Sequence, residues 1–498
     1  MITRWEGVLK SAKKSLFIAG SVLAATFLNA SAFAAENCAS NVASYKVSFP
    51  AEDAFSVSAE FQQPTSRLDL FWFPVAARPE GQSESVVDLK GFDADGNEVP
   101  LNYVGEGGWE TPEKKKLSSI SYRLLADHDE VNWGGVGAPG KDEVATHFDS
   151  SYFFAGHAFF LIDYEWPACA IDVTFDLPAA WSVTSPWPMQ GDVATASGPW
   201  NLGQNVFSMG ADKAITNSIG GRELTWLVAD SLKDAKPDIE RLFKVLPDVY
   251  AEFWGGADWD KYTVFFFGDD MTDGGAFQDS FAMRLATPLN EAEKVTWSHT
   301  LGHETMHLWN GAGPLRGENP DQTNWLTEGF TDYLTIKLMR QAGFLDDNML
   351  QQRIANILRR FEIAKLMSPD VKLFEATKRR GENWFLIYGG GALTALLLDA
   401  ELSAEDPDAF RNLMRDLYEH ADKPYTIDRL MDRMNAASGG KAGELIAWMD
   451  THPGAAEIRE RLAGHGLQAA FFGVDEFYVR FPECGRRDCA PGFLKGPR

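Results

Sequence analysis

The chain has 498 residues and a formal net charge of −25 at pH 7, from 46 Lys and Arg against 71 Asp and Glu. A chain this acidic is repelled by phosphate backbones and anionic lipid surfaces, which argues against nucleic acid as a partner. The length is sufficient for two or three domains.

The first 34 residues have the three-part pattern of a secretory signal peptide. Basic residues precede an apolar run over 16–28, and Ala32-Phe33-Ala34 closes it, so we expect cleavage after Ala34. An uncleaved anchor is the alternative, although the run is short for a membrane span. No later run is long enough to cross a bilayer. The sequence therefore predicts an exported chain, periplasmic or secreted, with no stable membrane span after cleavage.

Four cysteines follow this segment, and an even number in an oxidising compartment suggests two disulfides. Cys484 and Cys489 are close enough for a local loop, which would leave Cys38 to pair with Cys169. Three pairings are possible, and the sequence does not choose among them. A cysteine-based zinc site is disfavoured because the spacing does not match the usual two-residue knuckle.

Residues 35–215 are predicted to form a β-rich N-terminal domain. Short stretches of β-branched and aromatic residues alternate there with clusters of Gly, Pro, Asn and Asp, as in a β-sandwich-type domain. The expected strands include 45–49, 68–73, 119–124 and 171–175. No catalytic motif falls in this region.

The remainder of the chain is richer in helical periodicity. The sequence predicts helices over 238–254 and 293–309, a strand over 263–267, a polar loop over 311–323, and a helix over 325–341 with Thr323 or Asn324 as N-cap. Further helices are expected over 349–366, 384–402, 407–420, 426–436 and 441–466. The sequence thus predicts a multidomain α+β fold with an α/β domain over 216–375, a helical C-terminal domain over 376–470 and a tail over 471–498.

One stretch carries recognisable chemistry, because His303-Glu304-Thr305-Met306-His307 has the pattern H-E-x-x-H. Residues four apart lie on one face of a helix, so both imidazoles can reach one cation about 2 Å away, as tetrahedral zinc requires. Glu304 projects to the side where the attacking water would sit and is placed to take its proton. A surface helix with two unrelated histidines is the alternative.

A catalytic zinc also needs a third protein ligand, and Glu328 is the candidate. It lies in the first turn of the helix predicted over 325–341, with Asp332 one turn further along the same face. There Asp332 can accept the outer N–H of a ligand histidine and fix its tautomer. The alternative is an acid favoured by the helix dipole and a second, solvated acid. We expect His299 to be structural, because catalytic zinc keeps its fourth position open for water.

H-E-x-x-H followed by a helix with E-x-x-x-D resembles the thermolysin-like gluzincin metallopeptidases. More narrowly, HETMHLWN over 303–310 and LTEGFTDY over 326–333 resemble the glycyl aminopeptidase family of that clan. The resemblance extends from about residue 40 to about 466 and is most specific over 299–334 and 388–393. It implies a thermolysin-like zinc domain over 216–375, one zinc per chain bound by His303, His307 and Glu328, and Glu304 as general base.

The resemblance also implies a role for Tyr388. Related aminopeptidases carry a tyrosine at the start of a Y-x-x-G helix, where its hydroxyl stabilises the tetrahedral oxyanion. Tyr388 and Gly391 match that pattern, and a phenol is a suitable neutral donor for such charge. Gly390 stands where a lysine is usual. An aromatic side chain that only packs is the alternative.

The predicted substrate-binding residues are Gly274, Gly275 and Gln278. Relatives place a glutamate after a glycine pair to hold the α-amine of the substrate, but Phe277 stands at that position here. A phenyl ring cannot neutralise an ammonium by charge pairing. Gln278 or Asp279 can substitute only if the register shifts.

We therefore predict an exported zinc metallopeptidase that cleaves a peptide or protein substrate in the manner of an aminopeptidase. Two alternatives stay open. One is an endopeptidase or amidase that needs no free N-terminus, and the other is a catalytically silent, zinc-stabilised periplasmic binding protein. The oligomeric state and the residue preference do not follow from the sequence.

Overall fold

The computed structural model describes most of the chain between Cys38 and Lys495. The described residues are 38, 40–51, 54–127, 131, 146–148, 150–219, 221–257, 259–269, 273–287, 291–311, 313–471, 477–481 and 490–495. The predicted signal peptide, Cys484 and Cys489 lie outside them. Internal contacts define a β-rich unit (residues up to Asn217, Glu223–Lys236 and Lys261–Asn290) and a helical unit (Ser218–Arg222, Pro237–Asp260 and Glu291–Arg498).

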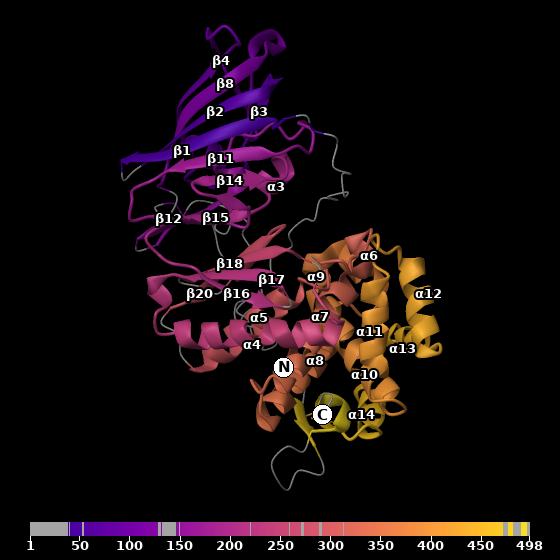
Figure 1. Ribbon diagram of the computed structural model, residues 1–498. Helices are drawn as coiled ribbons and strands as arrows, with labels where there is room; N and C mark the ends of the chain where they lie inside the picture. The colour runs from indigo at the N-terminus through magenta and orange to yellow at the C-terminus, as the bar shows by residue number, and fades with distance from the viewer. Residues whose placement is uncertain are drawn as a thin grey trace, which may run out of the picture. The chain divides into compact units, whose positions relative to one another are not determined.

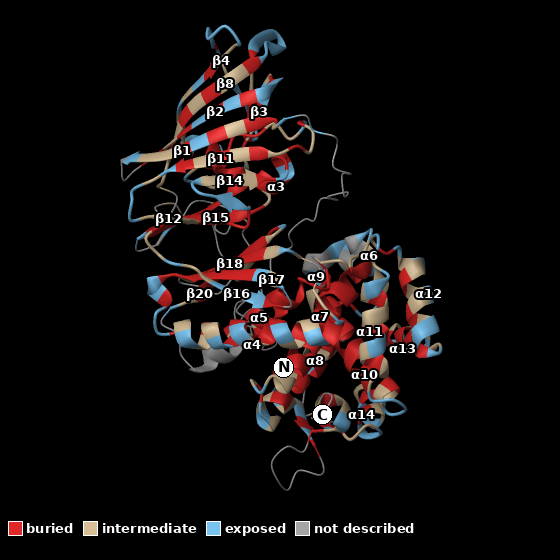
Figure 2. Cartoon of the chain, in the orientation of Figure 1, coloured by how far each residue is buried: buried red, intermediate tan, exposed pale blue. Residues whose placement is uncertain are grey.

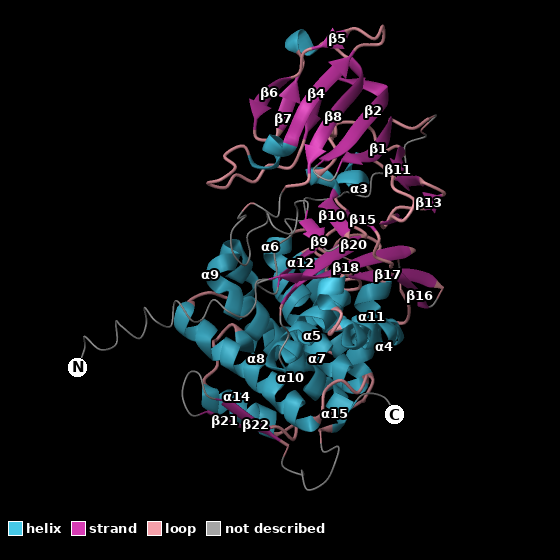
Figure 3. Cartoon of the chain, turned by 90° about the vertical axis from the view of Figure 1, so that its left-hand side faces the viewer, coloured by secondary structure: helices cyan, strands magenta, loops and turns pink. Residues whose placement is uncertain are grey.

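The β-rich unit contains two sheets that share one core (Figures 1 and 3). The larger sheet has the order β13 (Met189–Gln190), β14 (Val193–Ala196), β11 (Ile171–Asp176), β1 (Ala43–Ala51), β2 (Ala54–Thr65), β8 (Leu117–Leu125), β4 (Val86–Phe92) and β5 (Glu98–Val99). The smaller has the order β12 (Ser182–Thr184), β15 (Val206–Gly210), β10 (Ser151–Ala155) and β9 (Thr146–Phe148). A three-stranded ribbon has the order β3 (Arg67–Asp69), β7 (Gly108–Glu110) and β6 (Asn102–Gly105).

Alternating hydrophobicity explains this arrangement. In β2, Val57, Ala59 and Phe61 are buried and the residues between them are exposed, so one face of the strand turns inward (Figure 2). The inward residues pack with aromatic residues of the smaller sheet, among them Phe154 and Phe207, into one hydrophobic core.

A disulfide bond joins Cys38 to Cys169, with their Cα atoms 5.7 Å apart. The two cysteines precede β1 and β11, which pair in parallel with Ala43 opposite Ile171. The bond therefore fixes the start of the described chain to the middle of the larger sheet.

A five-stranded sheet follows, with the order β16 (Ile215–Ile219), β17 (Arg222–Val228), β18 (Lys261–Asp269), β20 (Ser280–Ala286) and β19 (Asp273–Ala276). Strands β17, β18 and β20 pair in parallel, and β19 adds an antiparallel edge. The middle of β18 is buried at six consecutive residues, as expected for a continuous apolar strand of a parallel sheet.

The helical unit contains most of the helices (Figure 3). They are α4 (Lys236–Trp254), α5 (Glu291–Met306), α6 (Pro320–Asn324), α7 (Thr331–Gln341), α8 (Asp347–Met367), α9 (Arg380–Phe385), α10 (Gly391–Ser403), α11 (Ala409–Glu419), α12 (Ile427–Ser438), α13 (Lys441–Met449), α14 (Ala455–Ala463) and α15 (Gly492–Lys495). Two π-helical segments, η6 (Trp325–Phe330) and η8 (Leu386–Gly390), precede α7 and α10. A hairpin of β21 (Gln468–Phe471) and β22 (Phe477–Arg480) follows α14.

Helix α10 is the central core helix of this unit. It is apolar on nearly every side and contacts α7, α8, α11 and α13 (Figures 1 and 2). Among the described residues, Glu382–Ser403 is the one stretch long and apolar enough to cross a membrane, and 89% of its apolar window is buried inside the protein. Because a buried core helix meets the same criteria, this stretch is weak evidence for a membrane span.

Several predicted helix boundaries are wrong. The helix expected from 325 begins at Pro320, a residue favoured in the first turn, so Thr323 and Asn324 lie inside it and not at its N-cap. The segment expected over 441–466 breaks into α13 and α14 around Pro453. The predicted architecture is nevertheless confirmed: the protein is a multidomain α+β chain with a β-rich N-terminal domain and a helical C-terminal part.

Candidate metal centre

His303 and His307 lie on one face at the end of α5. The helix ends at Met306, but the N–H of His307 still donates to the carbonyl oxygen of His303 at 3.3 Å. The two imidazoles are therefore one turn apart, with ring centroids separated by 4.8 Å. Both side chains are buried.

Glu328 completes a group of three ligand atoms with the spacing that zinc needs. Its Oε2 lies 3.3 Å from Nε2 of His303 and 3.5 Å from Nε2 of His307. Two atoms bonded to one tetrahedral zinc at about 2.0–2.1 Å lie about 3.4 Å apart. Two imidazoles and one carboxylate are also the donor set of catalytic zinc sites. The residues therefore fit zinc.

The local fold that presents Glu328 differs from the prediction. The residue was expected in the first turn of an α-helix, but it lies in the π-helical segment η6. Single π turns occur often at functional sites, because the wider turn re-aims a side chain. A Cβ on Gly329 would lie 2.4 Å from the Cα of Gly391, so only glycines let η6 and the start of α10 approach this closely.

A second carboxylate, that of Glu304, also faces the histidines. The ligand-type atoms of His303, Glu304 and His307 all lie within 4.8 Å of one another, and Glu304 is buried. Glu328 has the tetrahedral spacing to both imidazoles. Of the two carboxylates, Glu328 therefore has the geometry of a third ligand, and Glu304 lies beside that group.

Asp332, which the sequence predicted to orient a ligand histidine, lies next to His303. Its Oδ1 accepts a hydrogen bond from Nε2 of His299 (2.6 Å) and lies 3.5 Å from Nδ1 of His303. Its Oδ2 pairs with Arg360 at 3.0 Å. Burial raises the pKa of Asp332, but Arg360 and His299 outweigh that effect and hold the pKa well below its usual range.

His299, His303 and Asp332 also lie close enough to form a metal-binding group. The guanidinium of Arg360 on Asp332 disfavours a cation there. Burial lowers the pKa of His299 to about 4, so this imidazole is neutral and donates to Asp332. The expectation that His299 is structural agrees with this arrangement.

Burial and the neighbouring carboxylates have opposite effects on the pKa of His303. Burial lowers its pKa, whereas hydrogen bonds with Asp332 and Glu328 and the charge of Glu304 raise it to about 10. In the zinc-free protein His303 therefore carries a proton at neutral pH. That proton occupies the position where a metal cation would neutralise the same carboxylates.

Tyr388 reaches the same carboxylate from η8. Its hydroxyl donates to Oε2 of Glu328 at 2.7 Å. Its ring stacks with that of His303, at a centroid distance of 5.8 Å, and lies tilted against that of Trp384, at 4.0 Å. Tyr388 is 3% exposed. The structure thus brings together His303, His307, Glu304, Glu328, Asp332 and Tyr388, which the sequence predicted to share a site.

Sequence reasoning missed two residues that support this group. The carbonyl oxygen of Asn310 accepts a hydrogen bond from Nδ1 of His307 at 2.8 Å. Its place in the HETMHLWN stretch was the available signal. Arg360, from α8, has no local motif that could have indicated its pairing with Asp332.

Two family models match parts of the chain. Residues 44–202 match the peptidase M61 N-terminal domain, and residues 296–368 match the M61 glycyl aminopeptidase. These matches support a gluzincin-type aminopeptidase family and a metallopeptidase hydrolase. No curated protein matches the chain.

Two solved structures are similar to this chain. An aminopeptidase N family protein from Idiomarina loihiensis is 16% identical with a TM-score of 0.67, and the match covers 86% of this chain and 79% of that one. An M1 zinc metallopeptidase from Deinococcus radiodurans is 14% identical with a TM-score of 0.48, over 82% of this chain and 94% of that one. The first likeness shows a common fold.

The predicted substrate-binding residues lie in the β-rich unit. Gly274 and Gly275 belong to β19, and Gln278 is exposed in the turn before β20. Phe277 is 6% exposed and packs in a hydrophobic cluster with Phe153 and Phe265. The position where relatives carry the amine-binding glutamate is therefore part of an apolar core.

Asp279 is not free to replace that glutamate. Its Oδ2 accepts hydrogen bonds from Nδ2 of Asn201 (2.7 Å) and Asn205 (3.3 Å). Its backbone N–H donates to Oδ1 of Asn205 at 2.8 Å. These bonds tie the turn between β19 and β20 to the segment before β15.

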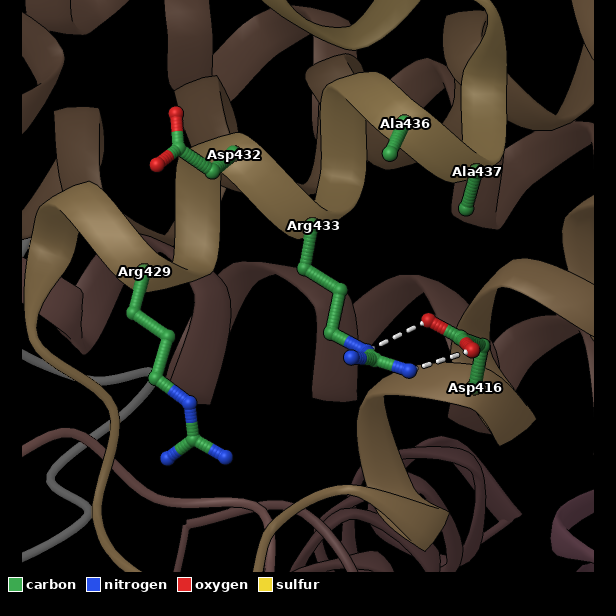
Figure 4. A pocket seen from close by; sticks show the side chains of 6 residues that line it. All are labelled: Asp416, Arg429, Asp432, Arg433, Ala436 and Ala437. Carbon is green, nitrogen blue, oxygen red and sulfur yellow. Dashed lines mark hydrogen bonds and ion pairs between the residues drawn. The ribbon is translucent and has the colours of Figure 1, made fainter.

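A surface concavity of about 670 Å³ between α11 and α12 belongs to a different part of the helical unit (Figure 4). Its guanidinium groups are committed to neighbours: Arg433 pairs with both oxygens of Asp416, and Arg429 pairs with Asp422 at 2.6 Å. None of its lining residues belongs to the candidate metal centre.

Proposed function

We propose that the chain is a zinc-dependent peptidase in which His303, His307 and Glu328 hold one zinc ion. The observation that carries this proposal is the pair of distances, 3.3 and 3.5 Å, between Oε2 of Glu328 and the two Nε2 atoms. A bound zinc ion supplies Lewis acidity, which polarises a carbonyl and lowers the pKa of water.

The side chains around the ligands supply the proton transfers. Glu304 takes a proton from the attacking water and delivers it to the leaving amine. The phenol of Tyr388, now bonded to Glu328 at 2.7 Å, donates to the negative charge that develops on the substrate carbonyl oxygen. Asp332 holds the Nδ1–H of His303, which keeps Nε2 directed at the metal.

Two substitutions test this mechanism on the purified mature protein. Glu304→Gln removes the base but keeps a side chain of the same shape, so we expect one zinc per chain and a loss of peptide hydrolysis of at least about 100-fold. His303→Ala removes a ligand, so we expect both zinc and hydrolysis to be lost. Metal analysis and a peptide-library assay provide the readouts. Full activity of Glu304→Gln would refute the proposal, and stoichiometric zinc without cleavage in the unaltered protein would favour a silent binding protein.

We propose aminopeptidase specificity on the strength of the match of residues 296–368 to the M61 glycyl aminopeptidase. One observation favours a second candidate, an endopeptidase or amidase: Phe277, at the position of the amine-binding glutamate, is buried in an apolar cluster. Turnover of an aminoacyl amide compared with its N-acetylated form separates them, because an aminopeptidase rejects the blocked substrate. Equal turnover of both would establish the second candidate.

We also propose export to the periplasm or beyond. The pattern of residues 1–34 supports it, and so does the disulfide between Cys38 and Cys169, since such bonds persist in oxidising compartments. Processing after Ala34, measured by mass spectrometry of protein recovered from outside the cytoplasm, tests this proposal. Recovery of the full-length chain from the cytoplasm with both thiols reduced would contradict it.

A further inference from the structure

Asn310, in the loop after the H-E-x-x-H helix, contacts both ligand-bearing segments. This residue is completely buried. Its carbonyl oxygen accepts the Nδ1–H of His307 at 2.8 Å, which places the lone pair of Nε2 toward the metal centre. The backbone of Asn310 thus sets the tautomer and the ring orientation of one ligand.

The side chain of Asn310 contacts the segment that carries Glu328. Its amide nitrogen Nδ2 lies 3.1 Å from the carbonyl oxygen of Leu326, 3.4 Å from that of Thr327 and 3.0 Å from Oγ1 of Thr331. These three acceptors flank Glu328 on both sides. One amide group therefore holds the π-helical turn that presents the third ligand.

The neighbouring residue, Gly311, shows how tightly this loop is packed. Gly311 has a φ of +112°, and a Cβ there would lie 2.5 Å from Cγ2 of Thr327 and 3.2 Å from Nδ1 of His307. The N–H of Gly311 donates to the carbonyl oxygen of Leu315 at 2.7 Å, which closes the loop. The turn after α5 is therefore packed tightly between the second histidine and the Glu328 segment.

We propose that Asn310 is a positioning residue that fixes Glu328 relative to His303 and His307. The proposal rests on the zinc site proposed above. Residues that hydrogen-bond to metal ligands fix the orientation of those ligands. Without such residues the metal must impose the orientation itself, so the metal affinity falls. Asn310 acts on two ligands at once, by its backbone on His307 and by its side chain on both flanks of Glu328.

The test is the zinc affinity of two variants, measured by competition with a chromophoric chelator. Asn310→Ala removes the amide and keeps the backbone carbonyl, so we expect zinc to bind about 10- to 100-fold more weakly. Thr331→Val keeps the shape of its side chain and removes one acceptor, so we expect a smaller loss of affinity. Asn205→Ala is the control, because Asn205 is equally buried and hydrogen-bonded but lies in the β-rich unit.

The thermal stability of the zinc-free proteins separates positioning from general support of the fold. We expect Asn310→Ala and Asn205→Ala to unfold at lower temperature than the unaltered protein, with weaker zinc binding only in Asn310→Ala. Unchanged zinc affinity in Asn310→Ala and Thr331→Val would overturn the inference, and if Asn310→Ala does not fold, unchanged affinity in Thr331→Val alone overturns it. Absence of zinc binding in the unaltered protein would instead overturn the proposed function.

Discussion

Two buried aspartates in the helical unit look alike and have different partners. Asp399 of α10 accepts hydrogen bonds from Lys337 (2.5 Å), Tyr333 and Ser403, all of which lie in helices α7 and α10. Asp332 of α7 pairs with Arg360 and His299 and also faces Nδ1 of His303. The Asp399 network is closed on itself, whereas the Asp332 network opens onto the metal centre. Burial and ion pairing alone therefore do not mark a functional carboxylate; its connection to the ligands does.

The largest effect should come from breaking the closed network. Asp399→Ala leaves the ammonium of Lys337 buried without its partner, which costs about 3–5 kcal/mol of unfolding free energy. We expect denaturant unfolding at a much lower midpoint, with the zinc affinity of the remaining folded protein unchanged. The double variant Asp399→Asn with Lys337→Met replaces the ion pair by two neutral side chains, so it should recover part of the unfolding free energy. A large loss of zinc affinity in folded Asp399→Ala would contradict the distinction between the two networks.

The corresponding change in the open network should act on the metal. Asp332→Asn keeps the size of the side chain and removes the charge that orients His303, so we expect zinc affinity to fall about 10- to 100-fold. Stability should fall as well, because Arg360 loses its partner. Arg360→Met, measured in parallel, shows how much of the effect comes from that lost pair. Asp332→Asn with unaltered zinc affinity would place both aspartates in the same structural class.

These two networks also show what the sequence could and could not predict. The spacing of His303, Glu304 and His307 is local, so the sequence alone placed them on one helical face. Glu328 and Asp332 followed from a short motif in the next helix. The π-helical turn that presents Glu328 has no signal of its own, because it depends on the contact between Gly329 and Gly391.

Partners supplied from distant helices were also invisible in the sequence. Arg360 reaches Asp332 from α8, and Asn310 connects His307 to Thr331 through a loop whose path depends on tertiary packing. The β-rich and helical parts of the chain were predictable because periodicity reports local burial. The helix start was misplaced because Thr323 and Asn324 are good capping residues, yet Pro320 begins the helix one turn earlier.

The two ends of helix α10 belong to different networks, so substitutions at its start test the same comparison with a smaller structural change. Its start packs on η6, where a Cβ on Gly391 would lie 2.2 Å from the carbonyl oxygen of Trp325. Gly391→Ala therefore has to separate η6 from α10, at a cost of about 1–3 kcal/mol. Tyr388 and Glu328 lie on either side of this contact, and both belong to the proposed catalytic site. We therefore expect kcat to fall more than KM rises.

Gly390→Ala is the matched control for Gly391→Ala. A Cβ at Gly390 would first meet Cδ1 of Leu386, at 2.9 Å, and a flexible side chain can move aside. We expect its kcat to stay much closer to that of the unaltered protein. Equal kinetic losses in both variants would show that the η6 contact has no special influence on the site.

The last expected effect is a pH dependence that belongs to the open network alone. The pKa of His303, raised above its usual value to about 10 by Asp332 and Glu328 against the opposing effect of burial, means that zinc must displace a proton. Zinc affinity should therefore rise about tenfold per pH unit between pH 7 and 9 and level off near pH 10. Protonation of His303 also stabilises the zinc-free fold. This stabilisation is complete below pH 6.5, the pKa of an unfolded histidine, and disappears as the pH rises through about 10.

In Asp332→Asn the pKa of His303 falls, so the slope of zinc affinity against pH should flatten, whereas folded Asp399→Ala should keep the full slope. A pH-independent affinity in the unaltered protein would mean that His303 binds zinc without releasing a proton, and the link from Asp332 to the metal would lose its electrostatic basis.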